Sequence, residues 1–216
     1  MRKLLIFLFC FLVLPVFAQN ATPFCTRMST RIQVKTRPGN PKYVTQYSKE
    51  QFLKMTQANF SPYTLGLTVA KPDVTIEVKP KLTQQLEQIC VTLSDVTIEM
   101  NYPTLLVYID KKYVPSSCEY QTIKEHEDYH VAVASQALAF FKKDVEKVVT
   151  DTVMNLSPKI VYNRGEIKPA VSKYTATIAS ALQPVLDHIK AKLDEKNAAI
   201  DTPEMYQATT AVCNNW

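Results

Sequence analysis

The segment IKEHEDYHVAV, residues 123–133, combines two histidines and a glutamate in the order His-Glu-x-x-His. On a helix, residues four apart lie on one face about 6 Å apart, so His126 and His130 can present two imidazole nitrogens to one metal ion. Glu127 lies one position further round, where its carboxylate can reach a water at the metal without being a ligand itself. This spacing supports metal-assisted hydrolysis, and it predicts a Zn²⁺ site with Glu127 as the general base.

The alternative is that the spacing is a coincidence and that both histidines are ordinary helix residues. At about 100° per residue, the two histidines share a stripe with apolar residues, while Lys124 and Asp128 point away from it. Burial of two histidines and a glutamate without partners costs free energy, and a metal ion supplies a partner for all three. The two intervening positions, which zinc proteases usually keep uncharged, hold Asp128 and Tyr129. These two residues favour a helix that binds a metal without catalysis.

A catalytic zinc site needs a third protein ligand, which the motif does not supply. His188 is the remaining histidine, and an antiparallel pair of long helices would bring it level with His130. The alternative for His188 is a surface position. Glu204 is the second choice as ligand, although an acid in the first turn of a helix is also stabilising by itself. Glu166 is a third choice.

A zinc hydrolase also needs a hydrogen-bond donor for the developing oxyanion. Tyr162, Arg164 and Tyr206 are the donors we consider, and each has a structural role as its alternative. The sequence does not choose among them.

The N-terminus predicts export. Arg2 and Lys3 precede an apolar run, and Val16-Phe17-Ala18 has the pattern of a cleavage site, so we expect residues 1–18 to be a secretory signal peptide. Residues 19–216 then form a single domain of 198 residues, 216 minus 18. The apolar run is short for a membrane span, so we expect no stable membrane anchor after cleavage and a secreted or periplasmic location.

The charge balance excludes some partners. Removal of Arg2 and Lys3 leaves 23 basic residues, 25 minus 2, against 20 acidic ones, which is a net charge of +3. This is too mild to suggest a nucleic-acid or membrane-surface partner, and no basic run stands out. A peptide or protein substrate is the partner that we expect.

The cysteines indicate disulfides. Cys10 lies in the expected signal peptide, and the even set of Cys25, Cys90, Cys118 and Cys213 remains. In an oxidising compartment, four widely separated cysteines favour two disulfides over a metal site. The sequence leaves all three pairings open.

Residues 29–113 alternate like strands. Strands are expected at 32–35, 74–78, 89–100 and 105–109, with an interruption at 94–95 and a turn at 101–103. Ser48 and Gln51 form a capping box that predicts a short helix through about Gln57. We therefore expect a mostly antiparallel sheet with one helix packed on it.

The C-terminal half has helical periodicity. Long helices are expected from Glu119 to about Thr150 and from Ala170 to about Asn197, joined by a loop. Thr202-Pro203-Glu204 predicts the start of a short last helix. The predicted fold is α+β, with the antiparallel N-terminal sheet packed against two long C-terminal helices, the first of which is a zincin-like active-site helix.

The segment CVTLSDVTI, residues 90–98, followed by the His-Glu-x-x-His helix and an alanine-rich stretch, resembles bacterial exported zinc-dependent proteases of the zincin superfamily. The resemblance covers residues 89–139. It implies zinc on His126 and His130, with Glu127 as the general base. The family often has a glycine where Tyr129 stands, and a Thr-x-His-Gly element where this chain has residues 201–206, so the third ligand stays open.

Two functional hypotheses follow. The first is an exported zinc-dependent metallohydrolase, above all a metallopeptidase that uses the His-Glu-x-x-His helix. The alternative is a non-catalytic, disulfide-stabilised envelope or secreted binding protein with a metal-binding or vestigial zincin helix.

Overall fold

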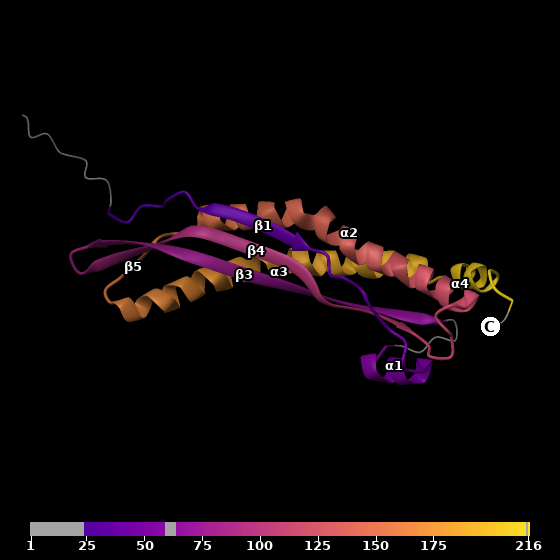
Figure 1. Ribbon diagram of the computed structural model, residues 1–216. Helices are drawn as coiled ribbons and strands as arrows, with labels where there is room; N and C mark the ends of the chain where they lie inside the picture. Colours follow the sequence, from indigo (N-terminus) through magenta and orange to yellow (C-terminus); the bar gives the residue numbers. More distant parts are fainter. Residues whose placement is uncertain (1–23, 59–63, 215) are drawn as a thin grey trace, which may run out of the picture.

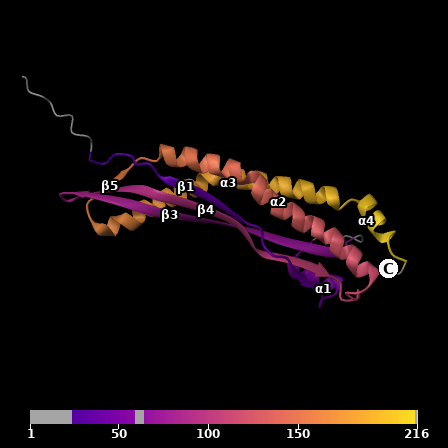
Figure 2. The same ribbon diagram turned by 45° about the horizontal axis from the view of Figure 1, so that its top comes forward.

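The computed structural model describes residues 24–58, 64–214 and 216, so the expected signal peptide, residues 1–18, lies outside the described part. The molecule is elongated along a β-hairpin of two long strands, β3 (Gly66–Gln85) and β4 (Gln88–Ile109), with α2 (Cys118–Asn155) and α3 (Ile167–Ile200) side by side along it (Figure 1 and Figure 2). The helices α1 (Lys49–Thr56) and α4 (Pro203–Thr210) are short.

Strand β4 is the centre of a five-stranded mixed sheet. One edge of β4 pairs over its whole length with β3, which is antiparallel to it. The other edge pairs with three short strands: β1 (Arg31–Arg37), β2 (Lys42–Val44) and β5 (Lys159–Val161). Of these, β1 and β2 run parallel to β4, and β5 runs antiparallel. Among the described strands, β3 therefore pairs along one side only.

The fold is α+β, but the expectation of a mostly antiparallel sheet is wrong. Both β1 and β2 run parallel to β4, from which they are separated in the chain by α1 and β3. Alternation of apolar and polar residues indicates a strand, but the direction of its pairing depends on how the chain returns to the sheet.

The predicted interruption at 94–95 and the turn at 101–103 are also wrong, because β4 continues through both. Opposite these positions the register of β3 shifts, between Lys79 and Pro80 and between Lys71 and Asp73. Such irregularities bend a hairpin and increase its twist without ending it. The polar and proline residues that suggested turns thus belong to two bent points of a single long ribbon.

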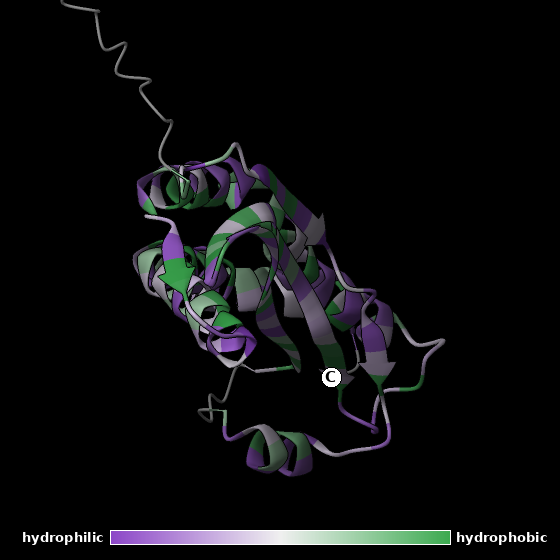
Figure 3. Cartoon of the chain, turned by 90° about the vertical axis from the view of Figure 1, so that its left-hand side faces the viewer, coloured by the Kyte–Doolittle hydropathy of each residue, from purple (hydrophilic) through white to green (hydrophobic). Residues whose placement is uncertain are grey.

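The core lies between the sheet and the two long helices. Val96, Ile98 and Met100 alternate along β4 toward α2 and α3, where Val145 and Ile178 are fully buried. On the other face of the sheet, α1 packs Phe52 and Leu53 against β4 in a separate cluster. Figure 3 shows hydrophobic and hydrophilic residues interspersed along the helices and strands, as expected for elements with one buried side.

The predicted helices are confirmed. α1 begins with the capping box of Ser48 and Gln51, and both reciprocal hydrogen bonds form. The two long helices extend a few residues beyond the predicted bounds, and α4 begins with Thr202 as N-cap and Pro203 in the first turn. The connection between α2 and α3 holds β5 and one short 3₁₀ turn, Arg164–Glu166.

Two disulfides form, as expected, and the structure gives their pairing: Cys25–Cys90 and Cys118–Cys213. The first joins the N-terminal segment to the beginning of β4. The second joins the first residue of α2 to the segment after α4. Two disulfides indicate an oxidising environment, outside the cell or in a periplasm. None of the helices in the described part of the chain is both long enough and apolar enough to span a bilayer.

Candidate metal centre

Helix α2 holds the three motif residues on its buried face, as the apolar stripe predicts. His126, Glu127 and His130 are 5%, 3% and 8% exposed. Ser117 is the N-cap of this helix, and its hydroxyl accepts a hydrogen bond from the backbone N–H of Tyr120. The motif therefore lies more than two turns inside a regular helix, which fixes the relative positions of the two imidazoles.

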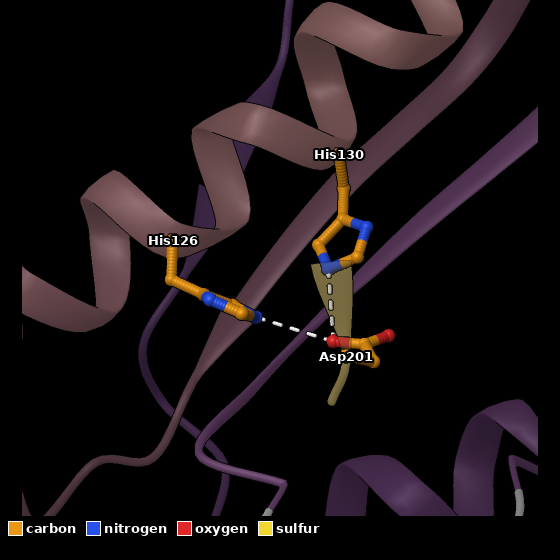
Figure 4. A group of neighbouring side chains, drawn as sticks. All are labelled: His126, His130 and Asp201. Carbon is orange, nitrogen blue, oxygen red and sulfur yellow. Dashed lines mark hydrogen bonds and ion pairs between the residues drawn. The ribbon is translucent and has the colours of Figure 1, made fainter. Parts of the chain in front are cut away.

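Asp201 completes a cluster with the two histidines. Its Oδ1 lies 3.2 Å from Nε2 of His126 and 3.2 Å from Nε2 of His130 (Figure 4). Two ligand atoms of a tetrahedral zinc, each about 2.0 Å from the ion, are about 3.3 Å apart, so these separations fit a shared ion. In the described part of the chain, these residues form the group of histidine, cysteine and acidic side chains that could hold a metal ion.

The backbone places Asp201 at the joint between two helices. Asp201 is the C-cap of α3, and its backbone N–H bonds to the carbonyl of Asn197. The next residue, Thr202, caps α4 by accepting from the backbone N–H of Met205. Because both helices end or begin here, the carboxylate projects from a turn of defined geometry and not from a loose tail.

Two further side chains hold the cluster from outside. His130 Nδ1 lies 3.0 Å from Oδ1 of Asn197. The hydroxyl of Tyr206 donates to Asp201 Oδ1 at 2.7 Å, and the Tyr206 ring lies 5.2 Å from that of His126. Asn197, Asp201 and Tyr206 lie at the end of α3 and the start of α4. Their contacts with the two histidines therefore attach the junction of α3 and α4 to α2.

Glu127 is held by strand β3. Its Oε2 accepts a hydrogen bond from the hydroxyl of Thr68 at 2.7 Å. Gly66 lies so close that a β-carbon there would be 2.7 Å from Glu127 Oε1 and 2.9 Å from Ile123 Cγ2. The start of β3 therefore needs a glycine to make room for the carboxylate and a threonine to orient it.

The cluster shifts the pKa values of its members. Burial raises the pKa of Glu127, and the nearby histidines and Thr68 offset only part of this. For His130, burial lowers the pKa, but Asp201, Glu127 and Asn197 outweigh it and raise the pKa to about 9. Burial opposes the ionised form of Asp201, yet hydrogen bonds from both histidines and Tyr206 hold its pKa well below the usual range. Burial, and after it the hydrogen bond to the Asp201 carboxylate, raise the pKa of Tyr206.

A cavity of about 810 Å³ opens beside the cluster. Glu127, His130, Asp201 and Tyr206 line it, together with residues of β3, β4 and α3. Its apolar wall has members from all four neighbouring elements: Ala70, Val74, Met100, Ala134, Leu138, Leu186, Ile189 and Leu193. Two of the three potential metal ligands, His130 and Asp201, and the glutamate therefore face a space large enough for part of a substrate.

The residues expected as third ligand lie elsewhere. The ring of His188 packs against that of Phe141, at 5.7 Å between centroids, and Glu204 is exposed in the first turn of α4. Glu166 bonds to Asn163 at the turn before α3. For His188 the register of the helix pair explains the difference. His130 lies level with Asn197, which is nine residues after His188 in α3 (197 minus 188). Asp201 takes the position that was expected for His188.

Asp128, the charged residue at the first intervening position of the motif, has structural partners. Asp128 accepts hydrogen bonds from Tyr43 at 2.5 Å and Lys124 at 2.6 Å, which ties α2 to β2. Tyr129 is 61% exposed. Both intervening side chains thus point away from the cluster, as their helical positions predict.

Of the three predicted oxyanion donors, Tyr206 lies at the cluster. Tyr162 and Arg164 lie next to β5, which pairs with the beginning of β4. The cluster lies at the opposite end of the sheet, where Gly66 pairs with Ile109.

Asp201, Asn197, Thr68 and Gly66 were missed by the sequence reasoning. Two signals were available. Asp201 directly precedes a strong helix cap, and Gly66 is one of only three glycines in the chain.

No family model, curated protein or solved structure matches the chain. The site's own geometry is therefore the basis for a functional proposal.

Proposed function

We propose that the protein is an exported zinc-dependent metallohydrolase, and specifically a metallopeptidase. The observation that carries the proposal is the convergence of His126, His130 and Asp201 beside the buried Glu127 at the wall of a large cavity. Three protein ligands with a fourth position left for water or substrate are typical of catalytic zinc sites.

The donor set favours zinc. Two imidazole nitrogens and one carboxylate oxygen are ligands that zinc accepts, whereas magnesium and calcium prefer oxygen ligands. Zinc bound there would supply a Lewis acid that polarises a substrate carbonyl and acidifies a water molecule. His126, His130 and Asp201 would hold it, and the bonds from Asn197 and Tyr206 would orient two of these ligands.

Glu127 is suited to be the general base. A carboxylate with a raised pKa accepts a proton more readily near neutral pH than an ordinary glutamate, and it can pass that proton to a leaving amine. Thr68 holds one oxygen of the Glu127 carboxylate, and Glu127 is a lining residue of the cavity. Tyr206 lines the same cavity, but its one hydroxyl hydrogen is donated to Asp201, so it would reach a developing oxyanion only if that bond were exchanged.

A peptide is the substrate class that fits the surroundings. The cavity is bordered by β3, a long strand whose second edge pairs with no other described strand. A strand edge of this kind can hydrogen-bond an extended peptide backbone, while the apolar wall accommodates side chains. The two disulfides and the predicted signal peptide support action in an extracellular or periplasmic environment.

The experiment is digestion of a mixed peptide library by the mature protein with zinc, read by mass spectrometry. The test variant is Glu127→Gln. The control is Glu125→Gln, because Glu125 is an exposed acid on the same helix. We expect the wild type and Glu125→Gln to cleave peptides, and Glu127→Gln to cleave at least 100-fold more slowly while it retains zinc. Equal cleavage by all three would refute the role of Glu127.

One observation favours the alternative of a non-catalytic metal-binding or vestigial site. Asp201 Oδ1 lies within hydrogen-bond distance of both histidines and of Tyr206, so the cluster is internally paired without an ion. A protein of this second kind would bind zinc weakly or not at all and would cleave no peptide in the same library. Zinc content and cleavage, measured on one preparation, separate the two functions.

A further inference from the structure

The turn at the tip of the β3–β4 hairpin contains an unusual residue, Leu86. The turn has two residues, Leu86 and Glu87, between the paired Gln85 and Gln88. Leu86 has a φ of 53°, which is left-handed backbone that leucine rarely adopts, and the residue is 90% exposed. Glycine, asparagine and aspartate are the usual residues at left-handed positions of two-residue hairpin turns. Leu86 thus combines backbone strain with exposure and contributes little packing, a pattern expected where a residue serves binding.

Further exposed apolar side chains lie beside this turn. Ile160 of β5 pairs with Cys90, four residues from Leu86, and Tyr162 lies two residues closer to the turn. Ile160 is 46% exposed, Tyr162 66%, and Leu82, on β3, 46%. All three lie within four residues of Leu86 along the strands, or about 13 Å. Figure 1 shows this tip and β5 at one end of the elongated molecule and α4 at the other. The hairpin tip is therefore surrounded by exposed apolar side chains.

The same end of the molecule is positively charged. Three segments meet there: residues 24–30, which Cys25–Cys90 joins to β4, the hairpin tip at 79–92, and residues 157–173 with β5 and the start of α3. These segments contain seven bases and two acids, which is a net charge of +5, 7 minus 2. Residues 19–216 as a whole have a net charge of +3, 23 minus 20, so the rest of the chain has −2, 3 minus 5. The mild charge of the whole chain therefore conceals a strongly basic end.

Most of these bases have no acidic partner. In the described part of the chain, six of the seven form no ion pair within 4 Å: Arg27, Lys81, Lys159, Arg164, Lys168 and Lys173. The seventh, Lys79, lies 3.7 Å from Glu77. The unpaired bases are therefore available to an anionic partner. Apolar side chains flanked by lysine and arginine are typical of protein surfaces that bind anionic lipid headgroups.

We propose that this end of the molecule, with Leu86 at its tip, docks on a membrane surface of anionic phospholipid. Leu86 and Tyr162 would enter the headgroup region, and Lys81 and Arg164 would contact lipid phosphates. The charge favours an anionic surface over a neutral apolar partner. The strained, exposed Leu86 favours a lipid surface over an acidic partner dissolved in water. The metal centre lies at the opposite end of the sheet and contributes no residue, so the docking surface is independent of the proposed function.

The test is flotation of the mature protein with lipid vesicles. One set of vesicles is phosphatidylcholine alone, and the other is an equal mixture of phosphatidylcholine and phosphatidylglycerol. We expect the wild type to bind the anionic vesicles at least about tenfold more tightly, with a smaller ratio at high salt. Glu127→Gln should bind the vesicles as the wild type does, because the metal centre has no part in docking.

Leu86→Asn separates docking from a structural role. It should lower vesicle affinity about fivefold, because the apolar side chain is lost. The same change should leave the midpoint of thermal unfolding unchanged or raise it, because asparagine adopts left-handed backbone more readily than leucine. The matched control is Val114→Asn, at a residue that is 60% exposed near the start of α2, and it should keep vesicle affinity.

A double variant tests the charge. Lys81→Gln combined with Arg164→Gln should lower the preference for anionic vesicles about five- to tenfold. The control combines Lys54→Gln and Lys111→Gln, two exposed lysines at the other end of the molecule, and should keep the preference.

The contrary outcomes are distinct. Absence of binding to anionic vesicles, or binding that Leu86→Asn leaves unchanged, would overturn docking by the hairpin tip. Binding to soluble polyglutamate but not to vesicles would indicate an acidic protein partner and reject the lipid surface. Vesicle binding without cleavage of any peptide would retain the docking surface and reject the peptidase, and cleavage without vesicle binding would do the reverse.

Discussion

His130 Nδ1 and Asn197 Oδ1 lie 3.0 Å apart, and this contact joins the motif helix to the end of α3. An amide oxygen only accepts hydrogen bonds, so Nδ1 of His130 carries the hydrogen. In neutral His130 the lone pair is then on Nε2, which faces Asp201 at 3.2 Å. The pair thus fixes both the register of the two helices and the tautomer that a metal requires.

Replacement of Asn197 tests this relationship. Asn197→Ala should lower zinc affinity about 10- to 100-fold, because His130 loses the partner that orients its ring. The measurement is a competition titration against a chromophoric chelator, with Lys196→Ala, an exposed neighbour, as the control. Equal affinities in the two variants would mean that Asn197 does not orient the ligand.

Thr68 is expected to set the acidic limb of the pH–rate profile. Its hydrogen bond lowers the pKa of Glu127, although burial still raises that pKa overall. Thr68→Val removes the bond and should raise the pKa further, so the base is ionised only at higher pH and the acidic limb of kcat/KM moves upward. Thr68→Ser keeps a hydroxyl and should restore the profile. A limb that stays in place in Thr68→Val would contradict this role.

The metal-free protein should bind zinc more tightly as the pH rises. The pKa of His130 is raised to about 9, so below that pH a proton must leave before Nε2 can bind a metal. Zinc affinity should therefore increase by up to about tenfold per pH unit toward pH 9 and then level off. An ordinary histidine, with a pKa near 6.5, would already level off near pH 7.

Competition titrations at several pH values measure this dependence. Asp201→Asn is informative as a comparison, because loss of the carboxylate lowers the pKa of His130 and should bring the plateau to lower pH. A wild-type affinity that is constant above pH 7.5 would show that His130 is not protonated in the metal-free site.

The two disulfides should differ in their effect on the metal centre. Each removal is expected to lower the free energy of unfolding by about 2–5 kcal/mol. Cys118–Cys213 fastens the segment after α4 to the start of α2, so a Cys118→Ala, Cys213→Ala protein should also bind zinc more weakly. Cys25–Cys90 lies at the opposite end of β4, and its removal should leave zinc affinity in the folded protein unchanged. Denaturant unfolding and chelator competition give both quantities.

The sequence was sufficient for the local features of the site. Four-residue spacing and an apolar stripe place His126 and His130 on one buried helix face, and the caps at Ser48 and Thr202 mark helix starts that the structure confirms. These features depend on neighbours within a few residues, so a single sequence contains them.

The third candidate ligand was not predictable in the same way. It depends on how far α3 slides along α2, and periodicity within each helix does not determine that offset. A shift of nine residues, from His188 to Asn197, moves the partner of His130 by about 13 Å. The directions of β1 and β2 were missed for the same reason, because long-range pairing sets them.

The most direct test of the account is the zinc content of the purified mature protein at neutral pH, measured by elemental analysis. The wild type is compared with His126→Ala, Asp201→Ala and His188→Ala. The account predicts about one zinc per chain in the wild type and in His188→Ala, and a large loss of zinc in the other two variants. Absence of zinc from the wild type even after zinc is added, or full occupancy in Asp201→Ala, would contradict it.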